Sequence, residues 1–270
     1  MIQYLVDNKS YALKEESKIT METIIEMRVM ASFISRAFGR SLSFVYRKGW
    51  ISPTALPARP LTPGSGAFED YLDYFHQNCH EKELISWMGK NTKKFPLDAW
   101  VYQEIIHEVQ PDVIIEIGNL YGGSTLFLAN MLDLENKGKV LAIDIDHSHI
   151  DFEHKRINWI TGDVNSQEII SKVESLLKPD YKVIIVEDSS HTFDNTLKVL
   201  RNYCRFVSVG SYFIVEDGIC KYPFIDGPKP GPFEATQEFL MNNQEFIVDK
   251  DKEKFVLTYN PSGYLKRIRA

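Results

Sequence analysis

The segment Val113-Ile-Ile-Glu-Ile-Gly-Asn-Leu-Tyr-Gly-Gly-Ser-Thr125 decides the fold class that this sequence predicts. Its first residues are almost all apolar, which is typical of a parallel strand covered on both faces. A glycine-rich turn follows, then a helical pattern to Leu134, and then a second apolar strand that ends at Asp144 and Asp146. Strand, glycine turn, helix, strand and acid together predict the βαβ unit of a nucleotide-type binding site.

The spacing of the glycines in this turn indicates which cofactor the unit binds. The NAD fingerprint requires Gly-x-Gly-x-x-Gly, whereas here the glycines stand at positions 118, 122 and 123. A cofactor without a pyrophosphate fits this spacing better, and S-adenosylmethionine (SAM) is the obvious one. Its amino acid end would lie by Gly118 and its ribose on Asp144, because an acid at the end of the second strand can accept both ribose hydroxyls. A purely structural glycine turn is the alternative.

Further short apolar segments extend this unit into a predicted parallel sheet. Residues 157–163 end in Gly-Asp163, whose carboxylate could reach an adenine amino group, although Gly-Asp is also a common turn. Two more predicted strands, 182–187 and 211–215, are separated by a helical pattern at 193–206. In open α/β sheets ligands bind at the carboxyl ends of the strands, so we expect the loops after these strands to form one site.

Acidic residues follow the last two of these strands. Lys182-Val-Ile-Ile-Val-Glu-Asp-Ser-Ser-His191 contains Asp188, and Tyr212-Phe-Ile-Val-Glu-Asp-Gly218 contains Glu216 and Asp217. Repulsion among acids gathered at one edge of a sheet would lower stability unless a cation were bound. Three carboxylates suit a hard cation such as Mg²⁺, Mn²⁺ or Ca²⁺, whereas zinc would prefer more nitrogen or sulfur ligands.

His191 follows Asp188 within the same loop and is the predicted general base. Its ordinary pKa near neutrality lets it accept the proton of a hydroxyl, which is typically worth ~10²–10⁴ in rate. Glu187 is a competing metal ligand, but strand alternation directs it away from Asp188. Helix capping by Asp188 is the alternative to metal binding. Two acid-ended strands together with the histidine favour the metal.

The N-terminal region has weaker patterns. Residues 18–46 predict an amphipathic helix that packs or forms oligomers, with a membrane-surface role as the alternative. The proline- and glycine-rich stretch 51–66 predicts an irregular loop, and the aromatic spacing of 67–87 predicts a helix. We therefore expect a helical extension, residues 1–80, that serves oligomerisation or covers the substrate, followed by a catalytic domain, residues 81–270.

The C-terminal part completes the predicted sheet. Asp226-Gly-Pro-Lys-Pro-Gly-Pro232 is well placed as a substrate lid. Residues 246–248 and 255–259 predict a closing hairpin, which is the usual finish of a SAM-methyltransferase sheet by fold-level analogy. The expected architecture is α/β and Rossmann-like, with a mostly parallel seven-stranded sheet and a C-terminal antiparallel hairpin.

The composition limits the classes of binding partner that we expect for this protein. The net charge of the 270 residues is −6, so the basic face that nucleic acid requires is not expected. The three cysteines are scattered without CxxC spacing, which fits a reducing cytoplasm. No apolar run approaches the ~18 residues of a membrane span, and the N-terminus shows no signal-peptide pattern. We expect a cytoplasmic protein that acts on a small-molecule acceptor.

Several separated motifs occur in a distinctive order. They are Pro96-x-Asp-x-Trp-x-Tyr-Gln-Glu-Ile-Ile106, Glu116-Ile-Gly-x-x-x-Gly-Gly-Ser124, Asp188-Ser-Ser-His-Thr192, Val209-Gly-Ser-Tyr-x-Ile-Val-Glu-Asp217, Gly231-Pro232 and Asn260-Pro-Ser-Gly-Tyr-Leu-Lys-Arg-Ile268. In this order they resemble the cephalosporin hydroxylase/rhamnosyl O-methyltransferase family over residues 80–268. The sequence departs from the family pattern at Glu187, where an apolar residue is expected, and at Ser262, where the family commonly has glycine.

The resemblance implies a class I O-methyltransferase that depends on SAM and on Mg²⁺ (or Mn²⁺). Members act on antibiotic or glycolipid hydroxyls, often of a deoxysugar, and tend to form homo-oligomers; macrolide-sugar methyltransferases are relatives. By motif match the metal ligands would be Asp188, Glu216 and Asp217, with His191 as the base. The SAM site would comprise Glu116, Gly118, Tyr121, Gly122, Ser124, Asp144, Asp163 and Asp188.

Two other functions are alternatives. An iron hydroxylase would need a two-His-one-carboxylate site, and His191 is the only histidine near the acids in the sequence, since His147, His149 and His154 follow the second strand. A non-catalytic binding subunit that keeps the fold is the other alternative, and the retained acids and histidine argue against it.

Overall fold

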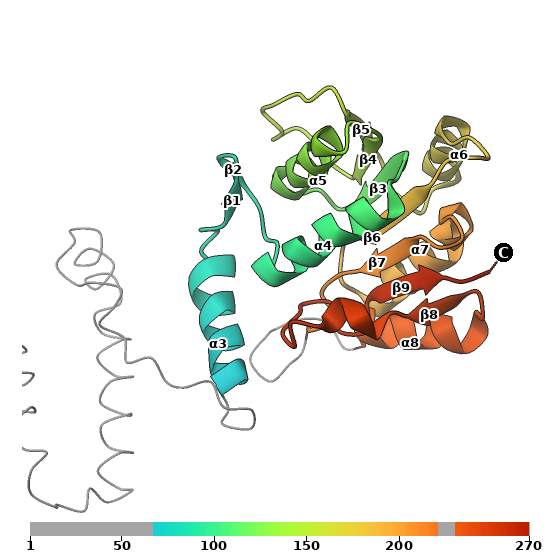
Figure 1. Ribbon diagram of the computed structural model, residues 1–270. Coiled ribbons are helices and arrows are strands. Elements are labelled where there is room, and N and C mark those ends of the chain that lie inside the picture. The colour runs from blue at the N-terminus through green and yellow to red at the C-terminus, as the bar shows by residue number, and fades with distance from the viewer. Residues whose placement is uncertain (1–66, 221–229, 270) are drawn as a thin grey trace, which may run out of the picture. The chain divides into compact units, whose positions relative to one another are not determined.

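A seven-stranded sheet forms the centre of the structure, a computed structural model that describes residues 67–220 and 230–269 (Figure 1). The strand order is β5-β4-β3-β6-β7-β9-β8. The strands from β5 to β7 pair in parallel, and β9 is antiparallel to both of its neighbours. This arrangement confirms the predicted Rossmann-like class. The strands are β3 (Val113–Ile117), β4 (Lys139–Asp144), β5 (Ile157–Thr161), β6 (Val183–Glu187), β7 (Tyr212–Val215), β8 (Phe246–Val248) and β9 (Tyr264–Arg267).

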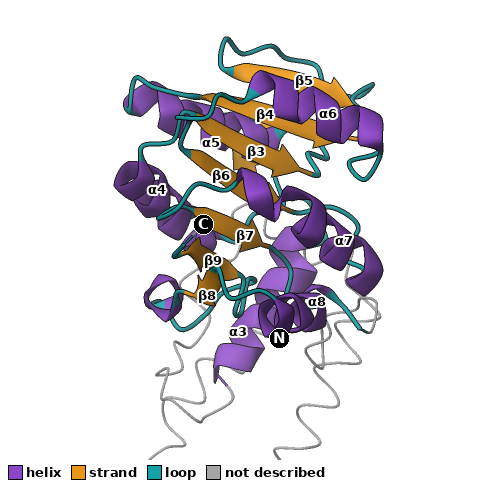
Figure 2. Ribbon diagram, turned by 90° about the vertical axis from the view of Figure 1, so that its right-hand side faces the viewer, coloured by secondary structure: helices purple, strands orange, loops and turns teal. Residues whose placement is uncertain are grey.

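Helices cover both faces of the sheet (Figure 2). α4 (Pro96–Val109) and α5 (Gly123–Leu134) lie on one face. α6 (Gln167–Leu176), α7 (Phe193–Tyr203), which runs on into the 3₁₀ turn η3 (Cys204–Phe206), and α8 (Pro232–Asn242) lie on the other. Within β3, Ile114 packs toward the first pair of helices, and Ile115 packs toward the second group. Successive side chains of a strand alternate between the faces, so a strand covered on both sides must be apolar throughout.

The end of the sheet differs from the prediction. Residues 255–259 form no strand, and the antiparallel strand next to β7 is β9. Val256 adopts a φ of 70°, which interrupts an extended run. The backbone N–H of Tyr259 donates to Asp98 instead of to a neighbouring strand. The prediction of a strand at 255–259 is therefore wrong. Leu257 and Tyr259 pack in a small cluster away from the sheet, whereas Phe255 and Val256 are exposed.

The described N-terminal part packs against the catalytic unit through aromatic residues. The helix α3 (Ala67–Phe75) continues as the π-helix η2 (His76–His80), so it ends before the predicted limit at Trp87. A short hairpin, β1 (Ser86–Trp87) and β2 (Lys90–Asn91), follows. The cluster that joins α3 to the rest of the unit consists of Leu72, Phe75, Phe95, Ile219 and Tyr259.

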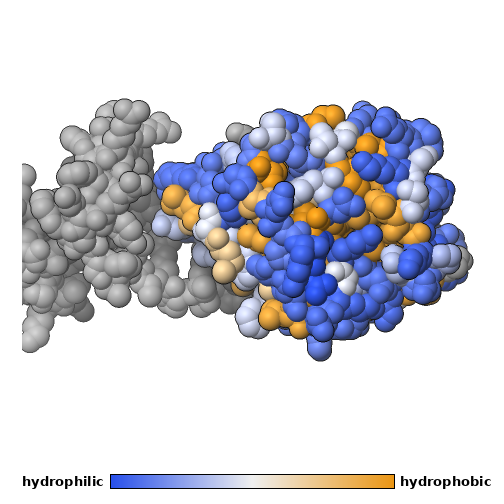
Figure 3. Space-filling model, turned by 90° about the horizontal axis from the view of Figure 1, so that it is seen from above, coloured by the Kyte–Doolittle hydropathy of each residue, from blue (hydrophilic) through white to orange (hydrophobic). Residues whose placement is uncertain are grey.

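Several predictions fall wholly or mostly outside the described ranges. They are the helix at 18–46, the loop at 51–66 and most of the lid at 226–232, and the domain boundary near residue 80 stays a prediction. Within the described part of the chain, no helix has the length and apolarity needed to cross a membrane. On the face seen in Figure 3, hydrophobic residues are interspersed with hydrophilic ones.

Asp98 joins α4 to the segment between η4 (Lys250–Glu253) and β9. Its buried carboxylate accepts hydrogen bonds from Thr258 Oγ1 at 2.6 Å, from Tyr264 OH at 2.8 Å and from the backbone N–H of Tyr259 at 2.8 Å. Burial raises the pKa of Asp98 to about 7, although these donors favour the ionised form.

We expect the difference in stability between the wild type and Asp98→Asn to depend on pH. The folded protein holds the Asp98 proton up to about pH 7, whereas the unfolded chain releases it at about pH 4. The wild type therefore loses stability as the pH rises through this window, and asparagine does not titrate. The advantage of the wild type should shrink by about 2 kcal/mol from about pH 5 to about pH 8. Urea unfolding at both pH values measures this, and an advantage that grows with pH would contradict it.

Candidate active site

A cavity of about 640 Å³ lies at the carboxyl ends of the parallel strands. It is lined by residues that end or follow β3, β4, β5, β6 and β7 in turn, namely Gly118, Asp144, Asp163, Asp188 and Asp217. Parallel strands present their carboxyl ends at the same edge of a sheet. The tertiary structure thus brings the predicted loops together in one cavity, as the strand pattern indicates.

Two glycines of the turn after β3 are required by close packing of the backbone. Gly118 has a φ of +86°, and a Cβ there would lie 2.0 Å from the carbonyl oxygen of Asp188. A Cβ on Gly123 would lie 2.1 Å from the carbonyl oxygen of Asn91. These positions therefore have a structural reason for glycine, and the same close approach brings the turn against the loop that carries Asp188.

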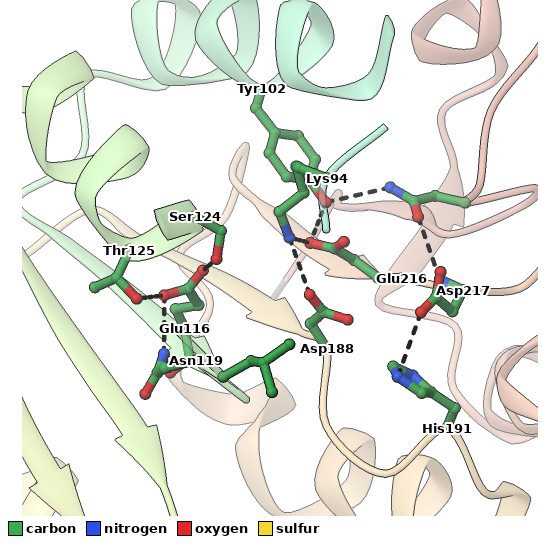
Figure 4. Close-up of polar contacts among 12 residues, drawn as sticks. Lys94, Tyr102, Glu116, Asn119, Ser124, Thr125, Asp188, His191, Glu216 and Asp217 are labelled. Atoms are coloured by element: carbon green, nitrogen blue, oxygen red, sulfur yellow. Dashed lines mark hydrogen bonds and ion pairs between the residues drawn. The ribbon is translucent and has the colours of Figure 1, made fainter. Parts of the chain in front are cut away.

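Glu116 lies behind the cavity wall and holds the glycine turn in place. Its buried carboxylate accepts hydrogen bonds from the hydroxyls of Ser124 and Thr125 and, at 2.8 Å, from Asn119 Nδ2 (Figure 4). Ser124 also lines the cavity. Gly122 is the N-cap of α5, packs beside Ile150 and Phe152, and is not one of the residues that line the cavity.

The remaining predicted SAM residues lie on the cavity wall. Asp144 Oδ2 accepts the backbone N–H groups of Asn119 at 2.7 Å and Leu120 at 3.2 Å, which fixes the turn to the end of β4. Asp163 Oδ1 accepts the backbone N–H of Asn165 at 2.9 Å. The hydroxyl of Tyr121 donates to Glu83 at 2.9 Å.

A buried lysine lies between two of the predicted metal ligands. Lys94 Nζ is 3.1 Å from Asp188 Oδ2 and also contacts Glu216 Oε1 (Figure 4). Only 5% of the Lys94 side chain is exposed. Tyr102 OH donates to the same Glu216 oxygen at 2.7 Å. Glu216 is therefore held by a cation and a phenol, both of which come from the segment at the start of the catalytic unit.

Asp188, His191 and Asp217 form the group that could hold a metal ion at this edge, since their ligand atoms lie within 4.8 Å of one another. His191 Nε2 is 3.3 Å from Asp217 Oδ2. Both His191 and Asp217 adopt positive φ, 52° and 54°. This conformation is unfavourable for residues other than glycine and persists only where the surrounding structure enforces it. Thr192, and not Asp188, occupies the N-cap of α7.

Asn260 links this group to the lysine network. Its Oδ1 accepts the backbone N–H of Asp217 at 3.3 Å, and its Nδ2 donates to Tyr102 OH at 3.2 Å. A continuous chain of hydrogen bonds thus runs from Lys94 through Glu216, Tyr102 and Asn260 to the backbone of Asp217.

Burial and neighbouring charges both shift the pKa values of the ionisable groups in the site. Burial lowers the pKa of His191, but the charges of Asp217 and Asp188 outweigh it and raise the pKa overall. Burial disfavours a charged Lys94, yet Asp188 and Glu216 raise its pKa above the ordinary range. One cation does not neutralise both carboxylates, so burial and the Asp188 charge raise the pKa of Glu216 despite the lysine.

Sequence reasoning missed three residues of this site. Tyr102 and Asn260 stand in motifs that carry the family resemblance, but their sequence context indicates no role for them. Lys94 follows another lysine in Lys93-Lys94-Phe-Pro, which has the composition of an exposed turn. A buried lysine gives no local signal, because its burial depends on carboxylates that are distant in the sequence.

Comparison of the sequence with known proteins identifies the family of this chain. The family model described as rhamnosyl O-methyltransferase/CmcI matches residues 79–268. The chain belongs to this family. Rhamnosyl O-methyltransferases of Mycobacterium tuberculosis (strain ATCC 25618 / H37Rv) and Mycobacterium leprae (strain TN) are each 30% identical to it, over 215 and 214 residues. The alignments cover 76% of this chain, and 86% and 92% of those proteins. As a member of this family, the chain is a SAM-dependent O-methyltransferase.

Solved structures of CmcI share the fold of this family member. One of them, with Mg and SAM, has a TM-score of 0.57 at 21% identity and covers 81% of this chain and 90% of its own. Another, with SAH, has a TM-score of 0.54 at 19% identity and covers 81% of this chain and 98% of its own. The likeness confirms the class I SAM-methyltransferase fold. The roles of the individual site residues stay predictions.

Gly118→Ala should destabilise the protein more than Gly210→Ala. Both glycines have nearly the same φ, +86° and +83°, but a Cβ at Gly210 meets nothing within 4 Å. The control therefore reports the cost of the left-handed backbone alone, about 1–2 kcal/mol, and the excess at position 118 reports the overlap with Asp188. Urea unfolding measures both variants. Equal losses would show that the turn can move away from Asp188.

Lys94→Met should lower the free energy of unfolding by about 3–5 kcal/mol, because it leaves the buried Glu216 and the half-buried Asp188 without their cation. Lys90→Met is the matched control. Lys90 pairs with the exposed Asp151 at 2.6 Å, and such surface pairs contribute about 1 kcal/mol or less. Denaturant titration in the presence of EDTA compares the two variants, and equal losses would contradict the central place of Lys94.

Proposed function

We propose that this protein transfers the methyl group of SAM to a hydroxyl of a sugar or sugar-bearing small molecule. His191 is the general base in this proposal, and Asp188, Glu216 and Asp217 hold Mg²⁺ or Mn²⁺. The observation that carries the proposal is the position of His191, which contacts Asp217 and shares with Asp188 the cavity that Asp144 also lines. The acceptor class is supported by the curated relatives, which are named rhamnosyl O-methyltransferases.

His191 moves the proton in the proposed reaction. Its neutral imidazole takes the proton of the acceptor hydroxyl while the hydroxyl oxygen bonds to the methyl carbon and the carbon–sulfur bond breaks, with its electron pair going to sulfur. Asp217, at 3.3 Å, stabilises the imidazolium that results. Because both reactants would lie in the same cavity, proximity would supply a large part of the acceleration.

The chemistry of the donor set fits a hard cation. Asp188 and Asp217 offer carboxylate oxygens close to each other, and Lys94 already forms ion pairs with Asp188 and Glu216. Glu216 is not part of that group, and its Oε1 contacts Lys94 and Tyr102, so in this proposal it would join the ligands through Oε2. When bound, the metal supplies positive charge that orients the acceptor and lowers the pKa of its hydroxyl.

The walls of the cavity fit SAM. The volume of about 640 Å³ lies within the range of small-molecule sites, about 300–1,000 Å³. The absent Cβ of Gly118 lets the turn approach closely, and Ser124 and Tyr121 line the same wall. Asp144 would accept the ribose hydroxyls and Asp163 the adenine amino group, while Glu116 and Gly122 shape the turn from behind. Assembly into a homo-oligomer and a cytoplasmic location stay predictions.

His191→Ala should lower the rate of methyl transfer by about 10²–10⁴ while SAM binding is retained. His107→Ala is the matched control, because His107 also pairs with a carboxylate, Glu135 at 2.7 Å, but is exposed. The assay follows product formation from SAM and candidate deoxysugar acceptors, with and without EDTA. Product that forms equally well in His191→Ala, or under chelation, would overturn the proposed mechanism.

A further inference from the structure

A second group of side chains that could hold a metal ion lies outside the acidic site. Among the described residues, His76, His80 and Glu81 also bring one ligand atom each within 4.8 Å of one another. His76 Nε2 is 3.9 Å and His80 Nδ1 is 3.2 Å from Glu81 Oε1. These residues form a two-His-one-carboxylate set, which the sequence around Asp188 and Asp217 does not contain.

The local backbone explains why these side chains converge. They occur in His76-Gln-Asn-Cys-His80-Glu81, where two histidines four positions apart lie on one face of a helical turn. The turn is a π-helix, closed by a hydrogen bond of 2.9 Å from the N–H of Glu81 to the carbonyl of His76. The two imidazole rings stack with centroids 5.2 Å apart. Short π-helices of this kind occur frequently at functional sites.

The group is held in position before any ligand binds. Only 15% of the His76 side chain and 13% of the His80 side chain are exposed. His80 packs beside Tyr259, with ring centroids 5.8 Å apart. Glu81, at 56%, is the exposed member, and the imidazoles are therefore fixed while the carboxylate can adjust its position.

The group faces the reaction cavity. His76, His80 and Glu81 all line the cavity that also contains Asp188, His191 and Asp217. The histidines come from the helix before the catalytic unit, whereas the acidic site comes from the ends of β6 and β7. The cavity therefore has two separate sets of ligands with different chemistry.

We propose that His76, His80 and Glu81 bind a divalent transition-metal ion, Zn²⁺ by preference, at the wall of the cavity and separately from the carboxylate site. Two imidazoles and a carboxylate are a preferred ligand set for Zn²⁺, and H-x₃-H is a recurrent ligand spacing. Three protein ligands leave one coordination position for water or for an oxygen of a bound molecule. Mg²⁺ favours oxygen ligands, so the two sets select different ions.

The histidine–carboxylate pair His107–Glu135 on the surface serves as a comparison for the proposed site. His107 and Glu135 form such a contact at 2.7 Å, but the His107 side chain is 77% exposed, and the pair is not part of a group of three ligands among the described residues. The proposed site differs in having a second imidazole, low exposure of both rings and a cavity in front of them.

Titration of the full-length protein with Co²⁺ as a spectroscopic substitute for Zn²⁺ tests the proposal. The titration is done in excess Mg²⁺, without SAM or acceptor. We expect visible ligand-field absorption that saturates at one Co²⁺ per chain and that Zn²⁺ abolishes. Loss of an outer-shell partner of a metal ligand typically lowers affinity 10–100-fold, so His80→Gln, which removes a ligand itself, should lower it by at least about 100-fold.

Two control variants separate this site from the others. His107→Gln changes the surface pair and should leave Co²⁺ binding unchanged. Asp217→Asn changes the acidic site and should also leave it unchanged. If near-UV circular dichroism shows that His80→Gln is misfolded, Glu81→Gln, whose side chain is exposed, decides instead.

The proposal is overturned if the wild type shows no Co²⁺ absorption in excess Mg²⁺. It is equally overturned if Asp217→Asn abolishes the absorption while His80→Gln and Glu81→Gln retain it. Because no SAM or acceptor is present, failure here would leave the proposed methyl transfer untouched, and failure of methyl transfer would leave this site untouched.

Discussion

The rest of the site depends on the two ion pairs that the buried ammonium group of Lys94 forms. The ammonium group lies between Asp188 and Glu216, whose carboxylates follow neighbouring parallel strands. Two such groups would repel each other in a buried place, and removal from water disfavours each of them as an ion. A single cation stabilises both, and its own burial is tolerated only because they are there. The lysine thereby lets the ends of β6 and β7 carry acids side by side.

The helix α4 gives this arrangement its rigidity. Asp98 and Tyr102 are four residues apart and lie on the same buried face of the helix. Asp98 accepts hydrogen bonds from the Thr258–Tyr259 segment, and Tyr102 contacts both Glu216 and Asn260. One helix therefore fixes the end of β7 and the loop before β9, and through Asn260 it fixes the backbone of Asp217. The acids are oriented by hydrogen bonds from outside their own loops, which is the support that a precise site requires.

The cavity joins three sets of residues with different physical characters. The turn after β3 is shaped by backbone packing at Gly118 and by the hydroxyl groups around Glu116. The acidic edge is shaped by charge. The wall formed by His76 and His80 is shaped by stacked rings on a π-helical turn. In our proposals the first binds SAM and the second binds Mg²⁺ and carries the base. The third binds a transition metal.

The sequence was sufficient to predict the parallel strands, because a strand buried on both faces must be apolar at nearly every position, as β3, β4 and β6 are. It also predicted that Asp188, Glu216, Asp217 and His191 lie at one site, since parallel strands present their carboxyl ends at a common edge. The strand predicted at 255–259 was wrong, because Leu257 and Tyr259 pack in a local cluster and not on the sheet. The partners of those acids became visible only in the folded structure. Lys94 is 94 residues from Asp188 and 122 from Glu216, and His76 and His80 meet the cavity from a preceding helix. No local pattern encodes such contacts, because burial and charge pairing arise only when distant segments pack together.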